Sequence, residues 1–543
     1  MQKSQIGFLP NYRASDHIFT LHTLIDQQLN QHKSKIFSCF VDFGKAFDSI
    51  WHEGLLLKIL ESGVGGKTYD VIKTMYKNNE CAVKIGAKRT DFFPQKRGVM
   101  QGNNLSPTLF NIYINELAKT LEESTAPGIK LNDTEIICLL YADDLVLLSS
   151  SKEGLQQLLD HLHQFCQTWA LTVNRHKTKT MIFQKRSRCQ GNKLTFLLGS
   201  TKINQTNEYT YLGIKISSTG NFNLAVNELK EKAQIAFYAI KRSTNLNNVN
   251  IPIKIWMKIF KSVIEPIALY GCEVWGTLTH QDLLKWDKHP IEIMHTQFCK
   301  SILKVQRKTP NNACRAELGQ FPLLINIQKR IIKFYQHLKN SDPHTYHHKA
   351  FQCHGENSPL NQLVLRLCSE NNTSVSQDRP QTIWPNQIIT KQKENYISHW
   401  KDITKTQSKL ECYLALNREY TLADYLTMIN DQKLRKSLTM YRLSDHSLAI
   451  EKGRHRHSWL PREERFCQQC SKNEIETEVH FLLHCDKYTD IREKFMPKFR
   501  QKCPEFDSLS EQKRAQYLLG EKDDCAIIAA RYITSCHSLR DSQ

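Results

Sequence analysis

The sequence lacks the long apolar segments of membrane and secreted proteins. Its 543 residues contain no uninterrupted apolar run near the ~20 residues that cross a bilayer. The first residues, MQKSQIGFLPNYRAS, contain no hydrophobic segment of the signal-peptide kind. Long low-complexity tracts and internal repeats are also missing. We therefore expect a folded intracellular protein, nuclear or cytoplasmic, with no membrane partner.

Acidic residues are scarce relative to basic ones. Lys and Arg total 74 against 54 Asp and Glu, a formal net charge of +20. This excess favours a polyanionic partner, with nucleic acid ahead of an anionic membrane surface. A basic, solubilising surface without a specific partner is the alternative. Hydrophobic residues make up 40% of the chain, enough for sizeable cores, and the length suggests roughly three or four domains.

The seventeen cysteines are an odd number without a secretory context, which favours a reducing compartment and metal binding over disulfides. One group has ligand spacing: Cys467, Cys470, His480 and Cys485 in CQQCSKNEIETEVHFLLHC. Two cysteines followed by a histidine and a cysteine can close a tetrahedral, structural zinc site. A metal-free helical hairpin is the alternative, and His484 is a competing ligand. The neighbouring basic stretch EKGRHRHSWLPREER is a candidate RNA or target-DNA contact.

Carboxylates lie in two otherwise apolar segments. Asp42 lies at the end of IFSCFVDF (36–43), just before Phe43, in a pattern typical of a buried strand. Asp143 and Asp144 divide CLLYADDLVLLSS (138–150) into two short strands. If these strands are neighbours in one sheet, Asp42 and Asp143 converge, and hard oxygen ligands select Mg²⁺ or Mn²⁺. Two such ions suit phosphoryl or nucleotidyl transfer. An exposed hairpin turn with two aspartates is the alternative.

The remaining pattern predicts mixed α and β structure. We expect a helix over 45–60, although Gly54 weakens it, and one from Ser106, with Ser106 as N-cap and Pro107 in the first turn. An apolar stripe predicts a helix over 155–169. Strands are expected at 178–183 and 208–217. After Gly220 the pattern is mostly helical, and the polar, His- and Asn-rich stretch near 340–400 is the best linker candidate.

Six motifs in order then carry a specific resemblance: QIGFLPNYRASDHI, FVDFGKAFDSIWH, RGVMQGNNLSPTLFNIYINEL, YADD, VNRHKTKTMIF and YLGIKI. This series resembles the reverse transcriptase of non-LTR (LINE-type) retrotransposons and covers about residues 4 to 217. Downstream, IEPIALYGCEVWG and ACRAELGQFPL resemble thumb and post-thumb segments of the same elements. The resemblance implies an α+β right-hand polymerase with a fingers remnant, a palm and a helical thumb. An α-rich C-terminal region and a small zinc-binding module would follow.

The resemblance assigns roles to individual residues. Asp42, Asp143 and Asp144 would form the catalytic Mg²⁺ centre, with Asp42 and Asp143 as direct ligands of both ions and Asp144 in support. Asp48, the second aspartate of its motif, would have a structural role such as a cap or salt bridge. Lys177 would lie near the triphosphate and donate a proton to the leaving pyrophosphate; an exposed, solvated lysine is the alternative.

Three further residues are assigned to nucleotide and template binding. Phe47 would crowd the sugar 2′-OH and reject ribonucleotides, with helix–sheet packing as the alternative. Gln101 and Gly102 precede the helix of their motif, where a glycine lets backbone approach the nucleotide or template. Tyr-Leu-Gly at 211–213 resembles a primer-grip hairpin. The basic segments AKRTDFFPQKRG and FQKRSR would contact template–primer phosphates, and Phe92 and Phe93 are either stacking or core residues.

Together these features predict an RNA-directed DNA polymerase that uses an RNA template, a DNA primer and dNTPs, with Mg²⁺ (or Mn²⁺) and structural Zn²⁺. The predicted divisions are 1–217 fingers remnant and palm, 218–310 thumb, 311–440 helical connector, 441–500 CCHC zinc-binding region and 501–543 tail. The chain begins at the Q-x-G-F motif, so we expect an N-terminally truncated element that needs an existing 3′ end or an endonuclease in trans. The alternatives are a truncated, catalytically impaired remnant that only binds nucleic acid, and a purely structural protein.

Overall fold

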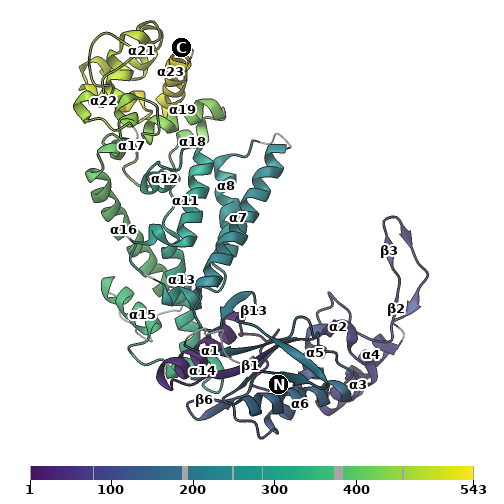
Figure 1. Cartoon of the computed structure of the whole chain (residues 1–543). Helices are drawn as coiled ribbons and strands as arrows, with labels where there is room; N and C mark the ends of the chain where they lie inside the picture. The colour runs from purple at the N-terminus through teal and green to yellow at the C-terminus, as the bar shows by residue number, and fades with distance from the viewer. Residues whose placement is uncertain are drawn as a thin grey trace. The chain divides into compact units, whose positions relative to one another are not determined.

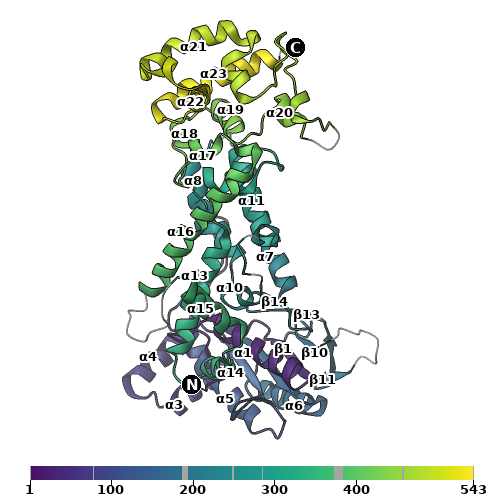
Figure 2. The ribbon, with the colours of Figure 1, turned by 90° about the vertical axis from the view of Figure 1, so that its left-hand side faces the viewer.

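The computed structural model describes residues 2–77, 79–185, 194–246, 250–279, 281–283, 285–371, 383–454 and 458–541. It is a mixed α/β, helix-rich structure (Figures 1 and 2). The chain forms two compact units. Unit 1 consists of Met1–Glu228, Gly271–Leu278 and Ile331–Val364, and unit 2 of Leu229–Tyr270, Thr279–Arg330 and Leu365–Gln543. Each unit therefore combines stretches that are far apart in the sequence.

Unit 1 carries all the described strands and the helices that pack on them. The strands are β1 (Ile36–Asp42), β2 (Glu80–Cys81), β3 (Lys84–Ile85), β4 (Lys88–Arg89), β5 (Phe93–Pro94), β6 (Ile129–Leu131), β7 (Thr134–Ile136), β8 (Cys138–Tyr141), β9 (Asp144–Ser149), β10 (Lys179–Phe183), β11 (Phe196–Leu198), β12 (Thr201–Gln205), β13 (Glu208–Tyr211) and β14 (Ile214–Ser217). The helices are α1 (Ala14–Asp26), α2 (Ala46–Ser49), α3 (His52–Glu61), α4 (Gly66–Lys77), α5 (Ser106–Glu122), α6 (Lys152–Thr168), the start of α7 (Asn223–Leu246), α10 (Cys272–Trp275), the end of α13 (Leu323–Lys339), α14 (Tyr346–Cys353) and the start of α15 (Pro359–Glu370).

A six-stranded sheet in the order β11-β12-β10-β1-β9-β8 organises unit 1. The strand β1 lies inside it, antiparallel to β10 on one side and to β9 on the other. An apolar strand can occupy this place because both of its faces are covered. Cys39 and Val41 point into the core formed with α3, α5 and α6, whereas Phe40 stacks on Tyr209 of the β13–β14 hairpin, at 4.5 Å between ring centroids. Since side chains alternate along a strand, Asp42 lies on the same face as Phe40.

The strands expected around the aspartates, at 178–183 and over 208–217, are confirmed, as is the helix over 155–169, which begins at Lys152 with Ser151 as its N-cap. The helix predicted over 45–60 is wrong as one element. It breaks into α2 and α3, with Ile50 at ψ 124. At this break the Gly98 N–H donates to the Ile50 carbonyl, so pairing with a distant segment replaces the helical hydrogen bonds.

Two further expectations differ from the structure. Ser106 is the first residue of α5 and not its N-cap, because its hydroxyl donates to the Met100 carbonyl at 2.6 Å. The stretch near 340–400 does not form an irregular linker in its described part. It contains α14, α15 and most of α16 (Ile383–Thr406), whose buried apolar residues lie at helical spacing between the polar ones. Residues 372–382 lie outside the described part.

In the described part of unit 2, the regular elements are helices, joined by turns and two isolated β-bridges. Its helices are most of α7 (Asn223–Leu246), α8 (Ile253–Ile259), α9 (Glu265–Ala268), α11 (Pro290–Leu303), α12 (Asn311–Glu317), the start of α13 (Leu323–Lys339), the end of α15, α16, α17 (Tyr413–Leu416), α18 (Tyr425–Met428), α19 (Gln432–Arg442), α20 (Ala449–Lys452), α21 (Thr489–Lys502), α22 (Glu511–Leu518) and α23 (Asp523–Asp541). Among the described helices, none is long and apolar enough to cross a membrane.

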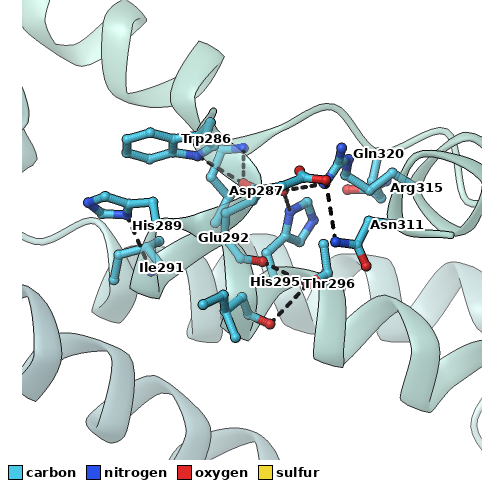
Figure 3. A network of polar contacts seen from close by, with 12 residues as sticks. Trp286, Asp287, His289, Ile291, Glu292, His295, Thr296, Asn311, Arg315 and Gln320 are labelled. Atoms are coloured by element: carbon cyan, nitrogen blue, oxygen red, sulfur yellow. Dashed lines mark hydrogen bonds and ion pairs between the residues drawn. The ribbon is translucent and has the colours of Figure 1, made fainter. Parts of the chain in front are cut away.

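A buried polar network joins α11, α12 and the start of α13 in unit 2 (Figure 3). Glu292 is fully buried and its carboxylate accepts hydrogen bonds from the Trp286 indole at 3.0 Å, Arg315 Nη1 at 3.0 Å and the Leu323 N–H at 2.8 Å. His295 Nδ1 lies 3.1 Å from the same carboxylate. Burial alone would raise the pKa of Glu292, but the charges of His295 and Arg315 outweigh it and lower this pKa to about 2.

Candidate active site

The aspartates singled out in the sequence lie together at one edge of the unit 1 sheet. The register pairs Asp42, the last residue of β1, with Asp144, the first residue of β9. Asp143 precedes Asp144 in the turn between β8 and β9. The expected convergence of the two strands is therefore observed, but the residue opposite Asp42 is Asp144 and not Asp143. All three side chains are partly exposed, so they reach solvent at the rim of an apolar sheet.

Burial and neighbouring negative charge raise the pKa values of Asp143 and Asp144. Burial raises the pKa of Asp143, and the charge of Asp42 raises it further. Burial, Asp143 and Asp42 together raise the pKa of Asp144 to about 6. Asp143 and Asp144, with raised pKa values beside the carboxylate of Asp42, form a site whose negative charge a cation would relieve.

Lys177 lies beside these acids. Its ammonium group is 3.6 Å from Asp42 Oδ1 and remains 68% exposed. The segment that carries it is fastened to the end of β1: the Asn174 N–H donates to the Asp42 carbonyl at 2.7 Å, and the Asp42 N–H donates to the Thr178 hydroxyl at 3.2 Å. Asn174 and Thr178 were not singled out in the sequence, although both stand in the quoted VNRHKTKTMIF motif. They hold the lysine within reach of the aspartates.

The turn that carries Asp143 is strained and is held by the N-terminal segment. Ala142 has φ 57, a left-handed conformation that costs a residue with a Cβ free energy. The Gln5 side chain compensates: Oε1 accepts from the Ala142 N–H at 3.0 Å and the Gly7 N–H at 2.8 Å, and Nε2 donates to the Ala142 carbonyl at 3.3 Å. Gln5 is thus a positioning residue that the sequence showed only as part of the QIGF motif.

Gly7 allows this close approach. A Cβ at Gly7 would lie 2.2 Å from the backbone nitrogen of Ala142, a distance that no side chain can occupy. The Gly7 carbonyl in turn accepts a hydrogen bond from Asn111 of α5 at 2.7 Å. The N-terminal segment is therefore fixed between the turn at Ala142–Asp143 and α5, and only a glycine fits at this position.

A cavity of about 550 Å³ adjoins this region and collects the residues expected to bind nucleotide and template. It is lined by Phe47, Gln101 and Gly102, by Phe8, and by Asn103, Asn104, Ser106, Pro107 and Thr108. Phe47 also stacks on Phe110 at 4.6 Å between ring centroids, so it both packs on α5 and lines the cavity. Gly102 has φ +85, which favours glycine. Gln101 Nε2 donates to Asp48 Oδ1 at 2.9 Å, so Asp48 orients Gln101.

The Tyr-Leu-Gly segment forms the turn of the β13–β14 hairpin, with Leu212 and Gly213 at positive φ. Tyr209 of this hairpin lies close enough to Asp144 and Asp42 that their charges, after burial, raise its pKa to about 12. The hairpin therefore flanks the aspartates on the face of the sheet that Asp42 occupies.

A basic arm, residues 80–97, extends from unit 1 as two short β-ladders, β2–β5 and β3–β4 (Figure 1). It carries five basic residues (Lys84, Lys88, Arg89, Lys96 and Arg97) against Glu80 and Asp91. Phe92 is 57% exposed and Phe93 48%, so neither is a core residue. The Arg89 guanidinium lies 4.2 Å from the centre of the Phe92 ring. Of the other basic segment, FQKRSR, residues 186–188 lie outside the described part.

In unit 2, the folding brings Cys467, Cys470, His480 and Cys485 together, with one ligand atom from each within 4.8 Å of the others. Cys467 Sγ lies 3.9 Å from Cys485 Sγ, and Cys470 Sγ lies 3.4 Å from His480 Nε2. Glu474 Oε2 is 2.8 Å from His480 Nδ1, which leaves Nε2 directed at the cysteines. The competing residue His484 instead contacts Glu511 at 3.1 Å. This donor set and its outer carboxylate fit zinc.

Comparison with known proteins agrees with this geometry. Residues 1–216 match the family model described as reverse transcriptase (RNA-dependent DNA polymerase), and this stretch contains the three aspartates. The resemblance to the enzymes of non-LTR retrotransposons is likewise confirmed by curated relatives.

Two of these relatives come from Drosophila melanogaster. The RNA-directed DNA polymerase from mobile element jockey is 26% identical over 297 residues, which cover 52% of this chain and 30% of that protein. The Pol polyprotein from type-2 retrotransposable element R2DM is 31% identical over 225 residues, 40% of this chain and 21% of that protein. The chain thus spans less than a third of the length of either relative. Among solved structures, telomerase from Candida tropicalis with a fragment of telomeric RNA gives a TM-score of 0.32 at 15% identity, over 64% of this chain and 53% of that one.

Proposed function

We propose that this chain is an RNA-directed DNA polymerase of the non-LTR retrotransposon type, with residues 1–217 as the fingers remnant and palm of a right-hand polymerase and residues 218–310 as its helical thumb. The observation that carries the proposal is the pairing of Asp42 with Asp144 at one sheet edge, with Asp143 beside them and Lys177 3.6 Å from Asp42. That constellation lies inside the stretch matched to the reverse transcriptase family.

In the proposed reaction, a primer 3′-hydroxyl attacks the α-phosphate of a dNTP; a phosphodiester bond forms and pyrophosphate leaves. Mg²⁺ bound by the aspartates would supply Lewis-acid charge to the attacking hydroxyl and the phosphate oxygens. Asp42, Asp143 and Asp144 hold carboxylate oxygens at the sheet edge for this purpose. The exposed ammonium of Lys177 reaches outward from Asp42, where it can donate a proton to the departing pyrophosphate.

The cavity lined by Phe47, Gln101 and Gly102 is the proposed nucleotide site. Phe47, held by its stacking on Phe110, would limit the space at the sugar and so disfavour ribonucleotides. Gly102 would allow backbone to approach the incoming nucleotide, and Gln101, oriented by Asp48, would contact the nucleotide or template. The basic arm is the proposed contact for the RNA template, because its exposed aromatics can stack on bases while its cations neutralise phosphates.

The deciding experiment is primer extension on poly(rA)/oligo(dT) with Mg²⁺. The wild-type chain should extend the primer, and Asp143→Asn should abolish extension. The matched control is Asp160→Asn, the same change at an exposed position of α6, which should retain activity. Folded wild-type protein that binds RNA but extends nothing would contradict the polymerase proposal and support the nucleic-acid-binding alternative.

We further propose that Cys467, Cys470, His480 and Cys485 hold a structural zinc ion. Three thiolates and one imidazole would leave no open coordination position, so the ion would stabilise unit 2 and take no part in catalysis. A Cys467→Ser/Cys470→Ser variant should lose one zinc per chain, while Cys503→Ser, a half-buried cysteine outside the cluster, should keep it. Equal zinc content in wild type and double variant would contradict this assignment.

A further inference from the structure

A second group of potential metal ligands lies in unit 1, away from the residues used above. Asp16 of α1, His337 near the end of α13 and His347 of α14 each offer one ligand atom, and the three atoms lie within 4.8 Å of one another. Asp16 is 0% exposed and His347 3%. More than 300 positions separate Asp16 from either histidine. The helices α1 and α14 lie side by side in both views of the chain (Figures 1 and 2).

The buried carboxylate of Asp16 needs a positive charge beside it to compensate its own charge. Its Oδ2 accepts the backbone N–H of Arg13 at 2.8 Å, and its Oδ1 lies 2.9 Å from His337 Nε2. Within the part of the chain that the structure describes, no lysine or arginine side chain forms an ion pair with this carboxylate. A buried carboxylate without a cationic partner costs several kcal/mol. Either a protonated His337 or a bound cation must compensate it.

His347 distinguishes these two possibilities. Its Nε2 has only a long contact of 3.4 Å with the Thr345 hydroxyl, and its ring otherwise packs against the rings of Tyr12 and His337. A simple Asp16–His337 ion pair leaves His347 Nε2 with this long contact alone, whereas a cation between the three side chains would use a ring nitrogen of His347 as a ligand.

We propose that Asp16, His337 and His347 bind one divalent cation with the preferences of zinc. Two imidazoles and one carboxylate are a common donor set for zinc and neighbouring transition metals. The ion would join α1 to α13 and α14. It would thereby steady the N-terminal segment, where His17 Nε2 lies 2.9 Å from the Ser4 carbonyl and 3.0 Å from that of Leu140, next to the catalytic turn.

Cobalt(II) titration of the full, chelator-stripped chain separates this site from the cysteine cluster. Cobalt in the cysteine cluster gives a strong thiolate-to-metal charge-transfer band, whereas an Asp/His/His site gives only weak d–d bands. We expect the wild type to take up one cobalt equivalent with the charge-transfer band and a second without it. His347→Gln should remove only the second, and Cys467→Ser should reduce only the first.

The matched control is His348→Gln, the next residue of α14, whose Nδ1 is already engaged 3.0 Å from the Leu338 carbonyl. It should keep the second equivalent, and zinc should raise the melting temperature of the control more than that of His347→Gln. A wild-type chain with no cobalt uptake beyond the thiolate-bound ion overturns the proposal, and this measurement requires no variant to fold. Loss of the second equivalent in His348→Gln overturns it as well. Neither result bears on polymerase activity, so the two proposals fail separately.

Discussion

Replacement of Gly7 by alanine tests whether the N-terminal segment positions the catalytic turn. The added methyl group would lie 2.2 Å from the Ala142 nitrogen and 2.9 Å from the Tyr141 carbonyl carbon, whereas ordinary contacts are 3.4–4 Å. Both atoms belong to backbone and cannot rotate away. The two segments must therefore separate by about 1 Å, because close-packed interiors leave no space to absorb the methyl.

The surrounding contacts direct that movement onto the turn. The Gly7 N–H is bound to Gln5 Oε1 at 2.8 Å and its carbonyl to Asn111 at 2.7 Å, so the N-terminal segment is anchored on both sides. Overpacking of this kind lowers the free energy of unfolding by about 1–3 kcal/mol. A displacement of about 1 Å at catalytic groups costs on the order of 100-fold in rate. We expect kcat in primer extension to fall by about that factor, with a modest loss of stability.

The assay is primer extension with Mg²⁺, combined with urea unfolding of the same protein. Gly65→Ala is the control, because nothing lies within 4 Å of a Cβ at Gly65 and its φ is not in the left-handed region. Gln5→Ala should also lower kcat, since it leaves the Ala142 and Gly7 N–H groups without their acceptor. Wild-type kcat in a folded Gly7→Ala protein would refute the positioning argument.

Three other changes have defined outcomes. Phe47→Ala should raise rNTP use relative to dNTP use about tenfold or more, because the cavity loses the ring that limits the sugar; single-nucleotide incorporation measures the ratio. Phe92→Ser combined with Arg89→Ser should weaken single-stranded RNA binding at least about tenfold, because stacking contributes about 1–3 kcal/mol per base. Filter binding measures the RNA affinity. Glu292→Gln should lower the free energy of unfolding by about 3–5 kcal/mol at pH 7, because it leaves Arg315 and His295 buried without their carboxylate. Urea unfolding measures that loss.

The Glu292 prediction has a defined pH dependence. The folded-state pKa is lowered from 4.5 to about 2, so the stabilisation is present above about pH 4.5 and disappears as the pH falls through 2. The difference between wild type and Glu292→Gln should shrink over that interval. Glu231→Gln, an exposed glutamate of α7, is the control and should leave stability unchanged at every pH.

The Phe47→Ala variant and the arm variant (Phe92→Ser with Arg89→Ser) also have outcomes that would contradict the predictions. An unchanged rNTP to dNTP ratio in an active Phe47→Ala enzyme would assign this ring to packing on Phe110 alone. For the arm, Val71→Ser changes an equally exposed apolar residue on α4 and should leave RNA affinity intact. If both arm and control variants bind RNA like the wild type, the template does not contact the arm.

The sequence by itself determined the local features of this protein. Alternation and apolar runs predict the strands β1, β8, β9 and β10, because side-chain direction in a strand depends only on neighbouring residues. The order of short motifs predicted the resemblance to reverse transcriptases over residues 4 to 217, and with it the candidate site residues Asp42, Asp143 and Asp144. The residues Cys467, Cys470, His480 and Cys485 likewise lie within one short segment. Their spacing therefore predicted the cluster without the structure.

Only the tertiary structure decided the features that depend on distant contacts. Gln5 reaches Ala142 across 137 positions, and Asp16 reaches His337 across 321. No local pattern encodes such pairs. The break at Ile50 follows from pairing with Gly98, and the helices within 340–400 form because packing outweighs their polar composition. The register of β1 and β9 likewise places Asp144, and not Asp143, opposite Asp42. This register is a property of the sheet and not of either strand alone.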